Sequence, residues 1–197
     1  MKIGVIGAGW LGGTVGKQWV KAGYEVMFST RHPEELASMV KELGSKASAG
    51  TPKQAAEFGT ILLFAVPGEA LEQVGRDLKE QIKGKIVIDA TNTSSGDNAA
   101  DSAKSLNGAR YVRAFSAVDA TAIESSAKRA SGKLGVPVAS DDSKAMETVV
   151  QLVRDAGSDP VVVGNLVSAK KFQRGAPAFR ANTTEAELRK ILGLSNK

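Results

Sequence analysis

The chain has 197 residues, of which 42% are hydrophobic, and it carries a formal net charge of +5. This length fits one α/β domain, or a dinucleotide-binding domain with a modest extension, and the composition is ordinary for a globular protein. Cysteine is absent and His32 is the sole histidine, which excludes disulfides, Cys-based zinc or iron–sulfur sites, thiol catalysis and metal sites built from several imidazoles.

Charge and hydropathy exclude further classes of protein. Lysine and arginine are spread along the chain rather than clustered, so we expect that the protein does not bind nucleic acid. An anionic cofactor would account for part of the positive charge. No stretch approaches the roughly 18 apolar residues of a membrane span. Glycines interrupt the amino-terminal segment that superficially resembles a signal peptide. We therefore expect a cytoplasmic protein with no membrane partner and no metal site.

The chain opens on the segment GVIGAGWLGG at residues 4–13, in which an apolar strand precedes glycines in G-x-G-x-x-G spacing. A helix is predicted to follow from about Leu11 to Lys21, which is the context that a dinucleotide site requires. Gly7 permits the tight turn, Gly9 lets the backbone approach a pyrophosphate, and Gly12 allows close packing of helix on strand. The N–H groups at the helix N-terminus suit phosphates. The alternative is a glycine-rich turn that binds nothing.

The second predicted strand, residues 24–28, leads into Ser29, Thr30, Arg31 and His32 without an acidic residue. An NAD-specific site usually carries Asp or Glu here for the ribose 2′-hydroxyl, whereas an NADP site needs room and positive charge. Ser29 and Thr30 can donate hydroxyl hydrogen bonds, and Arg31 can bind a phosphate through two parallel N–H donors. We therefore predict an NADP(H) site. The alternative is that Ser29 or Thr30 merely starts the next helix and Arg31 is solvated.

The rest of the chain alternates predicted helices with predicted strands. Helices are predicted at 33–43, from 51, and at 69–82, 121–130, 143–156 and 184–192. A short strand or edge segment is predicted to begin at 46–47, and further strands are predicted at 61–66, 85–90, 110–116, 136–139 and 160–163. Pro137 favours an edge strand or a strand start. Residues 94–105 are small and polar and predict a loop, most mobile at 96–98.

This alternation predicts the α/β class, with a Rossmann-type, doubly wound, mainly parallel sheet and a short α/β C-terminal extension. We expect a single NAD(P)-binding domain over residues 1–197, with a core of about 1–120 and an extension of about 121–197.

In such a sheet the ligand crosses the carboxyl ends of the strands. Ala65, Val66 and Pro67 end one predicted strand and offer an apolar wall to the nicotinamide half of the cofactor, although Pro67 fits a plain helix start equally well. Thr91 and Asn92 end another strand and can hydrogen-bond the carboxamide or the ribose, and turn capping is the equal alternative.

Two further strand-end residues admit two interpretations each. Phe115 either stacks on a substrate ring or belongs to the core, and Asp89 either takes part in catalysis or orients the turn that follows it. We predict no catalytic acid or base. This absence fits hydride transfer between two redox carriers, in which the cofactors supply the chemistry and the protein supplies orientation.

The sequence resembles the NADP oxidoreductases that depend on the deazaflavin coenzyme F-420. The resembling segments are GVIGAGWLGG at 4–13, FSTRHPEEL at 28–36, LLFAVPGEAL at 62–71, IVIDATN at 86–92, RAFSAVDA at 113–120, VASDDSKA at 138–145 and VVQLVRDAGSDPVVVGNLVSAK at 149–170. The resemblance implies that the pyrophosphate loop consists of Ala8, Gly9, Trp10 and Leu11. It implies that Thr30 and Arg31 bind the 2′-phosphate. It further implies that the nicotinamide half of the cofactor lies against Val66, Pro67, Ala70 and Asn92. It also implies a homodimer.

The chain departs from that family after residue 170, where KKFQRGAPAFRANTTEAELRKIL replaces an apolar helix. We therefore predict an NADP(H)-dependent oxidoreductase that transfers a hydride between NADPH and a small redox acceptor, and the acceptor stays open between a deazaflavin, a flavin and another small molecule. An imine reductase would need a long helical C-terminal half, which is not predicted here. A redox sensor or regulatory module that binds NADP(H) without turnover is the alternative from another class.

Overall fold

The structure is a computed structural model that describes residues 1–94 and 96–195. Its strands are β1 (Lys2–Ile6), β2 (Glu25–Ser29), β3 (Ala47–Gly50), β4 (Ile61–Phe64), β5 (Ile86–Asp89), β6 (Arg110–Ala114), β7 (Gly135–Ala139) and β8 (Asp159–Gly164). Within the described residues they form one eight-stranded sheet in the order β3-β2-β1-β4-β5-β6-β7-β8. The first six strands have the Rossmann order, so the predicted fold class is confirmed.

The sheet is mainly parallel, as predicted. Strands β1 to β6 run parallel, β7 pairs with β6 in the antiparallel sense, and β8 runs parallel to β7. The expectation that Pro137 marks an edge or a strand start is wrong, because Pro137 lies inside β7 and β7 lies between two strands. Proline is tolerated there because the antiparallel ladder with β6 reaches only Val138 and Ala139, so Pro137 has no partner on β6.

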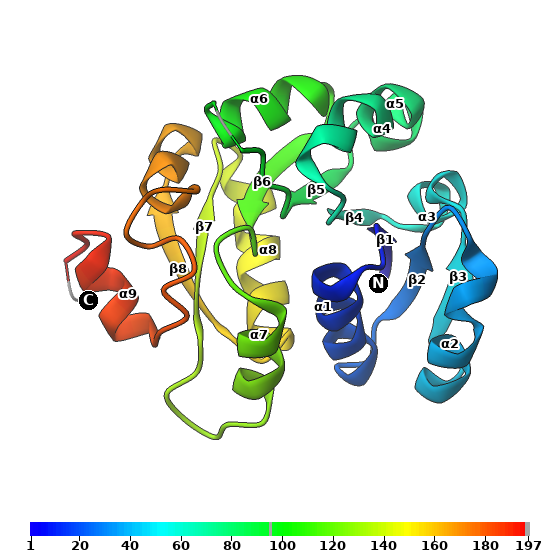
Figure 1. Ribbon diagram of the computed structural model, residues 1–197, viewed down its shortest axis with the longest axis horizontal. Coiled ribbons are helices and arrows are strands. Elements are labelled where there is room, and N and C mark those ends of the chain that lie inside the picture. The colour runs from blue at the N-terminus through cyan, green and yellow to red at the C-terminus, as the bar shows by residue number, and fades with distance from the viewer. Residues whose placement is uncertain (95, 196–197) are drawn as a thin grey trace.

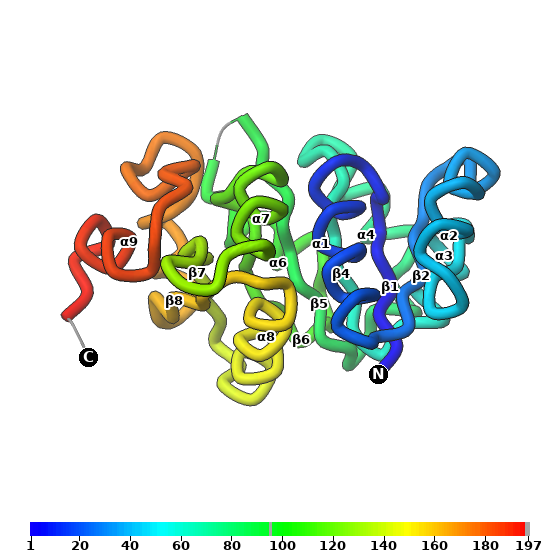
Figure 2. Tube along the Cα trace, turned by 90° about the horizontal axis from the view of Figure 1, so that it is seen from below, coloured from blue at the N-terminus to red at the C-terminus, as the bar shows by residue number. Residues whose placement is uncertain are grey.

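Helices cover both faces of the sheet (Figure 1). One face carries α1 (Trp10–Lys21), α2 (Ala37–Leu43), α7 (Ala120–Ala127) and α8 (Ser143–Asp155); the other carries α3 (Pro52–Phe58), α4 (Leu71–Asp77), α5 (Lys79–Ile82) and α6 (Asn98–Ser105). The remaining elements are the 3₁₀ helices η1 (Pro33–Leu36), η2 (Gly68–Ala70) and η3 (Leu166–Phe172), and α9 (Glu185–Ile191). Figure 2, in which the molecule is seen from below, shows α1, α7 and α8 next to one another in front of the sheet.

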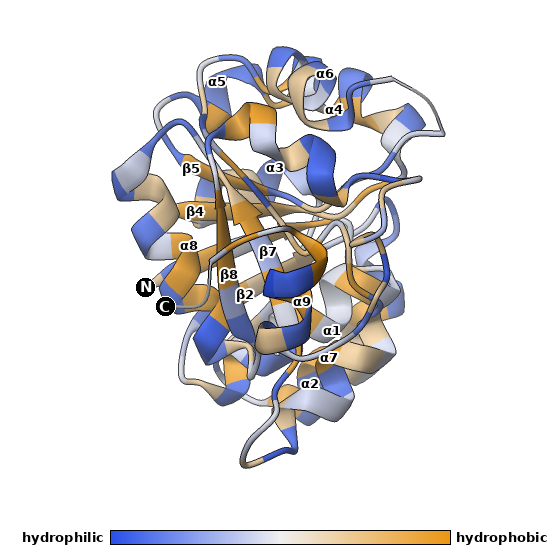
Figure 3. Ribbon diagram, turned by 90° about the vertical axis from the view of Figure 1, so that its left-hand side faces the viewer, coloured by the Kyte–Doolittle hydropathy of each residue, from blue (hydrophilic) through white to orange (hydrophobic). Residues whose placement is uncertain are grey.

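The sheet is apolar because both of its faces are covered. Figure 3 shows hydrophobic residues along the strands and hydrophilic residues on the outer surfaces of the helices. Trp19 of α1 is fully buried, and its indole Nε1 donates a hydrogen bond of 2.8 Å to the carbonyl of Leu152 in α8. Its ring meets Phe115 edge-on, with the ring centroids 6.0 Å apart. The amino-terminal core and the C-terminal extension therefore share one hydrophobic cluster.

The predicted loop at 94–105 is wrong over most of its length, because α6 begins at residue 98; residue 95 lies outside the described residues. The carboxylate of Asp97 caps this helix by accepting from the N–H of Ala100, and the buried Asn98 accepts from the N–H of Thr93 at 2.9 Å. Small side chains such as Ala99 are buried against neighbouring elements. Hydropathy alone missed the helix because its buried face is made of small and polar residues.

Two other boundaries differ from the prediction. The helix expected at 69–82 is divided into η2, α4 and α5, with a break at Leu78. The strand expected to reach residue 116 ends at Ala114, because Phe115 adopts a left-handed backbone with φ of 62°.

Over residues 1–94 and 96–195, no helix has the length and the apolar character needed to cross a bilayer.

Candidate cofactor site

A cavity of about 500 Å³ opens at the carboxyl ends of β1, β2 and β4. It lies at the switch point of the sheet, where the chain has wound outward from β1 to β3 and then crosses back to β4 on the other side. Its volume is in the range of small-molecule and cofactor sites. The residues that line it are Ile6, Gly7, Ala8, Gly9, Ser29, Thr30, Arg31, Glu35, Leu36, Pro52, Ala65, Val66, Pro67, Ala70 and Val74.

The turn from β1 to α1 supplies the floor of this cavity. Gly7 has φ of 97°, and a Cβ there would lie 2.7 Å from the carbonyl oxygen of Ala65. A Cβ on Gly12 would lie 2.2 Å from the carbonyl oxygen of Gly7, so this glycine lets the helix pack against the turn. A Cβ on Gly9 would meet no heavy atom within 4 Å. The open space in front of Gly9 therefore fits a bulky ligand group approaching the backbone.

The N-terminus of α1 faces the same turn. Gly9 occupies the N-cap position, and no side chain of the described residues caps the helix. Uncapped N–H groups at the start of a twelve-residue helix favour an anion, both by hydrogen bonding and through the helix dipole. The N–H of Ala8 is already used, because it donates to the carbonyl of Ser29 at 2.8 Å.

The turn after β2 supplies the predicted 2′-phosphate site. Ser29 is fully buried and its hydroxyl donates to the carbonyl of Val5 at 2.8 Å, so this side chain joins β2 to β1. Thr30 lines the cavity, and its hydroxyl oxygen lies 3.5 Å from the donor N–H of His32. Arg31 lines the cavity with an exposed side chain, and none of the described residues forms an ion pair with it. Its guanidinium is therefore available to an anionic ligand.

The turn after β4 supplies the apolar wall. Ala65, Val66 and Pro67 line the cavity together with Ala70 of η2. Pro67 also caps η2, so the two interpretations of this residue are compatible.

Five lining residues were not predicted: Ile6, Glu35, Leu36, Pro52 and Val74. Pro52 follows the end of β3, so the rule that ligands cross the strand ends applies to it as well. The sequence predicts where that strand begins, at 46–47, but not where it ends. Glu35 places a carboxylate in the same cavity as Arg31, and no spacing rule identifies it from the sequence.

The structure does not bring five predicted residues into the lining of this cavity, namely Trp10, Leu11, Gly12, Thr91 and Asn92. The side chain of Trp10 is 73% exposed at the start of α1. The hydroxyl of Thr91 donates to Asp89 at 2.7 Å, which is the turn-capping role. The amide nitrogen of Asn92 donates to the carbonyl of Ser116 at 2.7 Å, and its oxygen accepts from Arg113 at 3.2 Å.

Asp89 orients the turn that follows β5, as one of its two interpretations predicted. One carboxylate oxygen accepts from the N–H of Thr91 at 2.9 Å, and the other accepts from the Tyr111 hydroxyl at 2.5 Å and from Arg113. Burial and the neighbouring carboxylate raise the pKa of Tyr111 well above its usual value, so it acts as a neutral donor. Phe115 is fully buried against Trp19 and is a core residue.

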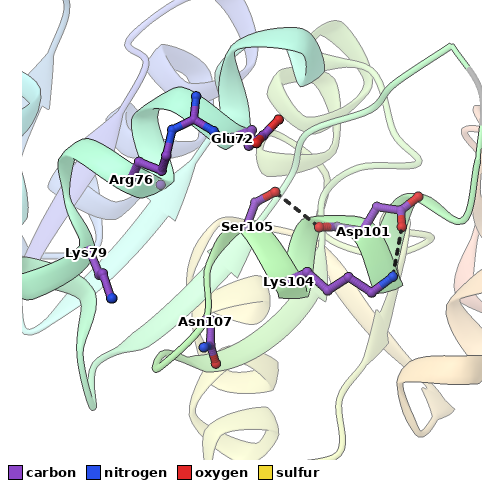
Figure 4. A pocket seen from close by; sticks show the side chains of 8 residues that line it. Glu72, Arg76, Lys79, Asp101, Lys104, Ser105 and Asn107 are labelled. Atoms are coloured by element: carbon purple, nitrogen blue, oxygen red, sulfur yellow. Dashed lines mark hydrogen bonds and ion pairs between the residues drawn. The ribbon is translucent and has the colours of Figure 1, made fainter.

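A second cavity, of about 460 Å³, lies between α4 and α6 (Figure 4). Four of its five charged side chains pair among themselves: Arg76 with Glu72, and Lys104 with Asp101. It lies in a helical layer rather than at the strand ends, so we assign it no part in the cofactor site. In the part of the chain that the structure describes, no group of three or more potential metal ligands occurs.

Known proteins are similar to the part of the chain that forms the cavity at the ends of β1, β2 and β4. Residues 2–93 match the family model described as NADP oxidoreductase, coenzyme F420-dependent. The match covers a little less than half of the chain. The matched part runs from β1 to the turn after β5, and it contains every residue that the sequence analysis predicts to contact the cofactor.

Relatives extend the similarity beyond residue 93. Metalloreductase STEAP3 from Rattus norvegicus is 25% identical over 179 residues, which cover 87% of this chain and 36% of the relative. The chain thus spans 35–36% of the length of the curated relatives that it matches.

Two solved structures share the fold. A hypothetical protein from Sinorhizobium meliloti is 22% identical with a TM-score of 0.81, covering 92% of this chain and 93% of that one. A candidate F420-dependent NADP reductase from Arthrobacter sp. FB24 is 20% identical with a TM-score of 0.79, covering 100% of this chain and 96% of that one. The strands and helices after residue 93 are therefore part of a fold that other proteins share.

Proposed function

We propose that the protein is an NADP(H)-dependent oxidoreductase that transfers a hydride between NADPH and a small acceptor of the deazaflavin or flavin type. The observation that carries the proposal is that Gly9, Thr30 and Arg31, from two separate turns, line one cavity together with the apolar Val66 and Pro67. The match of residues 2–93 to the NADP oxidoreductase model supports the choice of cofactor and the redox chemistry.

The side chains of the cavity suit the parts of NADP(H) in the order of the strands. The space in front of Gly9 and the uncapped N-terminus of α1 would hold the pyrophosphate. Arg31, with Thr30 beside it, would bind the 2′-phosphate by charge-assisted hydrogen bonds. Val66 and Pro67 would exclude water from the nicotinamide half.

The bound nicotinamide supplies the hydride chemistry, so the chain needs to orient the two reactants and needs no acid or base. Asp89 agrees with this role: it is fully buried, and both of its oxygens accept hydrogen bonds from neighbouring residues. The regulatory alternative uses the same cavity and differs only in having no turnover.

The cofactor assignment is tested by Arg31→Ala. We expect the Kd for NADPH to rise about tenfold to a hundredfold, because one charge-assisted hydrogen-bonding partner of the 2′-phosphate is lost. The Kd for NADH should change less than about twofold, since NADH lacks that phosphate. Isothermal titration calorimetry measures both constants.

Lys41→Ala is the matched control, because Lys41 is an exposed cation of α2 that does not line the cavity. Equal losses for NADPH and NADH in Arg31→Ala would contradict the assignment of Arg31 to the 2′-phosphate.

Turnover is tested by stopped-flow absorbance at the NADPH band with flavins, deazaflavins and quinones as acceptors. The proposal expects oxidation of NADPH with at least one of them. Tight binding of NADPH without oxidation by any acceptor would favour the regulatory alternative.

We also propose that the protein forms a homodimer, as its family resemblance implies. Light scattering coupled to gel filtration should give twice the 20.5 kDa mass of one chain. A monomer mass at micromolar concentration would contradict this part of the proposal.

A further inference from the structure

A largely buried polar cluster lies beside the cavity, on β5, on β6 and in the turn after β5. It consists of Asp89, Asn92, Tyr111 and Arg113, and we refer to it as the Arg113 cluster. The side chain of Arg113 is 1% exposed and forms an ion pair with the fully buried Asp89. A buried ion pair costs desolvation energy and stabilises a fold weakly at best. The other contacts of Arg113 therefore indicate a role beyond fold stability.

The two arms of the Arg113 guanidinium have different partners. Nη1 donates to the carboxylate of Asp89, whereas Nη2 donates to the side-chain oxygen of Asn92 at 3.2 Å. Asn92 then uses its amide nitrogen to donate to the carbonyl of Ser116 at 2.7 Å. Both polar ends of the Asn92 side chain are thus fixed, and the second arm of Arg113 fixes one of them.

The backbone of Asn92 contacts the turn after β4 that forms the apolar wall of the cavity. A Cβ built on Gly68 would lie 2.3 Å from the carbonyl oxygen of Asn92, so the backbones of the two turns are in close contact. Gly68 directly follows Pro67, which lines the cavity next to Val66. The position of Asn92 therefore determines where the turn after β4 can lie.

The segment after β6 is held in an unfavourable conformation at the same point. Phe115 is a non-glycine residue with φ of 62°, a region that favours glycine. The next residue, Ser116, is the one whose carbonyl binds Asn92. Such a backbone persists only where surrounding contacts hold it, and the Arg113 cluster supplies contacts of this kind.

We propose that Arg113 is a positioning residue that, through Asn92, fixes the nicotinamide half of the cofactor cavity and leaves the adenosine half unaffected. This inference rests on the proposed function, since it takes NADP(H) as the ligand. The adenosine half is built by Thr30 and Arg31 after β2, and neither of these belongs to the cluster.

Arg113→Lys separates positioning from fold stability. A lysine keeps the charge opposite Asp89, and Tyr111 still donates to that carboxylate, but one ammonium group cannot reproduce the two-armed geometry that also reaches Asn92. The variant should therefore fold but lack the hydrogen bond to the side-chain oxygen of Asn92.

The experiment compares two ligands by calorimetry. NADPH occupies both halves of the cavity, whereas adenosine 2′,5′-bisphosphate carries the adenosine and the 2′-phosphate but no nicotinamide. For Arg113→Lys we expect the Kd for NADPH to rise about fivefold to tenfold, the effect of one lost hydrogen-bonded contact. The Kd for the bisphosphate should stay within about twofold. The fluorescence of bound NADPH should shift towards that of the free coenzyme.

Arg110→Lys is the matched control, because Arg110 lies on the same strand and pairs with the partly exposed Asp142 outside the cavity. It should leave both dissociation constants unchanged. Asn92→Ala provides a second variant that leaves the Arg113–Asp89 pair intact. It should show the same selective loss, and the double variant Arg113→Lys/Asn92→Ala should lose no more than either single variant, because both break one chain of contacts.

Wild-type affinity for NADPH in Arg113→Lys, or equal losses for the two ligands, would overturn the positioning role. Additive losses in the double variant would overturn it as well. If Arg113→Lys fails to fold, wild-type NADPH affinity in Asn92→Ala overturns it by itself. If the wild-type protein binds neither ligand, the proposed function fails, and the inference that rests on it fails for that separate reason.

Discussion

Gly9, the N-cap residue of α1, has φ of −69° and ψ of −163°, a conformation that any residue adopts. Its neighbours in the motif are different: Gly7 has a left-handed φ of 97°, and Gly12 leaves no room for a side chain. Gly9 thus has no conformational reason to be glycine, and the space in front of it is open. At the scale of single residues, the fold explains the outer two glycines, whereas the middle one would be explained by the ligand that we propose.

Gly9→Ala is therefore expected to leave thermal stability nearly unchanged and to weaken NADPH binding by about tenfold or more. The added Cβ meets no protein atom within 4 Å, but it occupies the space through which a pyrophosphate would approach the backbone. Thermal melting and calorimetry on the same sample measure the two effects.

Gly13→Ala is the control for this variant. Its Cβ would lie 3.4 Å from the carbonyl of Ala8, an ordinary contact inside α1. Alanine in a helix interior should stabilise the fold by about 0.5–1 kcal/mol and leave binding intact. Unchanged NADPH binding in Gly9→Ala would show that the open space is not used by the ligand.

Asp142, directly before α8, joins two elements through one carboxylate. Its Oδ1 accepts from the N–H of Ala145 at 2.9 Å, which caps the helix, and the carboxylate also accepts from Arg110 of β6 at 2.7 and 3.0 Å. The hydrogen bonds from Arg110 and from the Ala145 N–H lower the pKa of Asp142 from 3.8 to about 2. At the scale of elements, this carboxylate sets where α8 begins relative to β6.

A lowered pKa makes this contribution depend on pH. The ionised carboxylate is favoured in the folded state, so its stabilisation is complete above pH 3.8 and is lost as the pH falls towards about 2. Asp142→Asn retains a capping side chain and loses the charge. We expect the difference in melting temperature between wild type and Asp142→Asn to shrink between pH 4 and pH 2. The difference should be small throughout, because both partners are partly exposed to solvent.

Glu80→Gln, on the exposed side of α5, serves as the control and should show no such change in this range. A wild-type advantage that stays constant from pH 7 to pH 2 would refute the role of the Asp142 charge.

The whole molecule is held together across the boundary between the core and the extension. Trp19 of α1 bonds the carbonyl of Leu152 in α8, and the hydroxyl of Tyr24, next to β2, donates to Asp155 at 2.5 Å. The main hydrophobic cluster includes residues from Ile3 to Ala156. We therefore propose that residues 1–197 unfold as one unit, with no independently stable core at 1–120.

Differential scanning calorimetry should show one transition whose calorimetric and van't Hoff enthalpies agree. Trp19→Phe should shift that whole transition down by several degrees, because the Leu152 carbonyl loses its donor and the smaller ring leaves a void. Trp10→Phe is the matched control: Trp10 is 73% exposed, so its melting temperature should match the wild type. Two separate transitions, in the wild type or in Trp19→Phe, would contradict a single unit.

Most of the sheet was predictable because its signals are local. Apolar runs of four to six residues between turn residues mark the strands, and the glycine spacing marks the first turn. The helix at 98–105 was not predictable in this way, since its small and polar residues become a buried face only where α6 packs against α4 and η3. The interior position of β7 likewise depends on pairing with β6 and β8, which no local pattern around Pro137 reveals.

By itself, the sequence determined the fold class, the three strand-end turns and the residues at ten of the fifteen positions that line the cavity. Most of these follow from backbone requirements of the glycines, from the donor chemistry of residues 29–31 and from the rule that parallel strands end at one edge. Ala8 and Ala70 are implied by the family resemblance alone. Only the tertiary structure decided that Asn92 binds Ser116 and Arg113, and that Glu35, Leu36 and Pro52 join the cavity. The physical reason is that hydrogen bonds between residues 21 or 24 positions apart exist only once the strands are side by side.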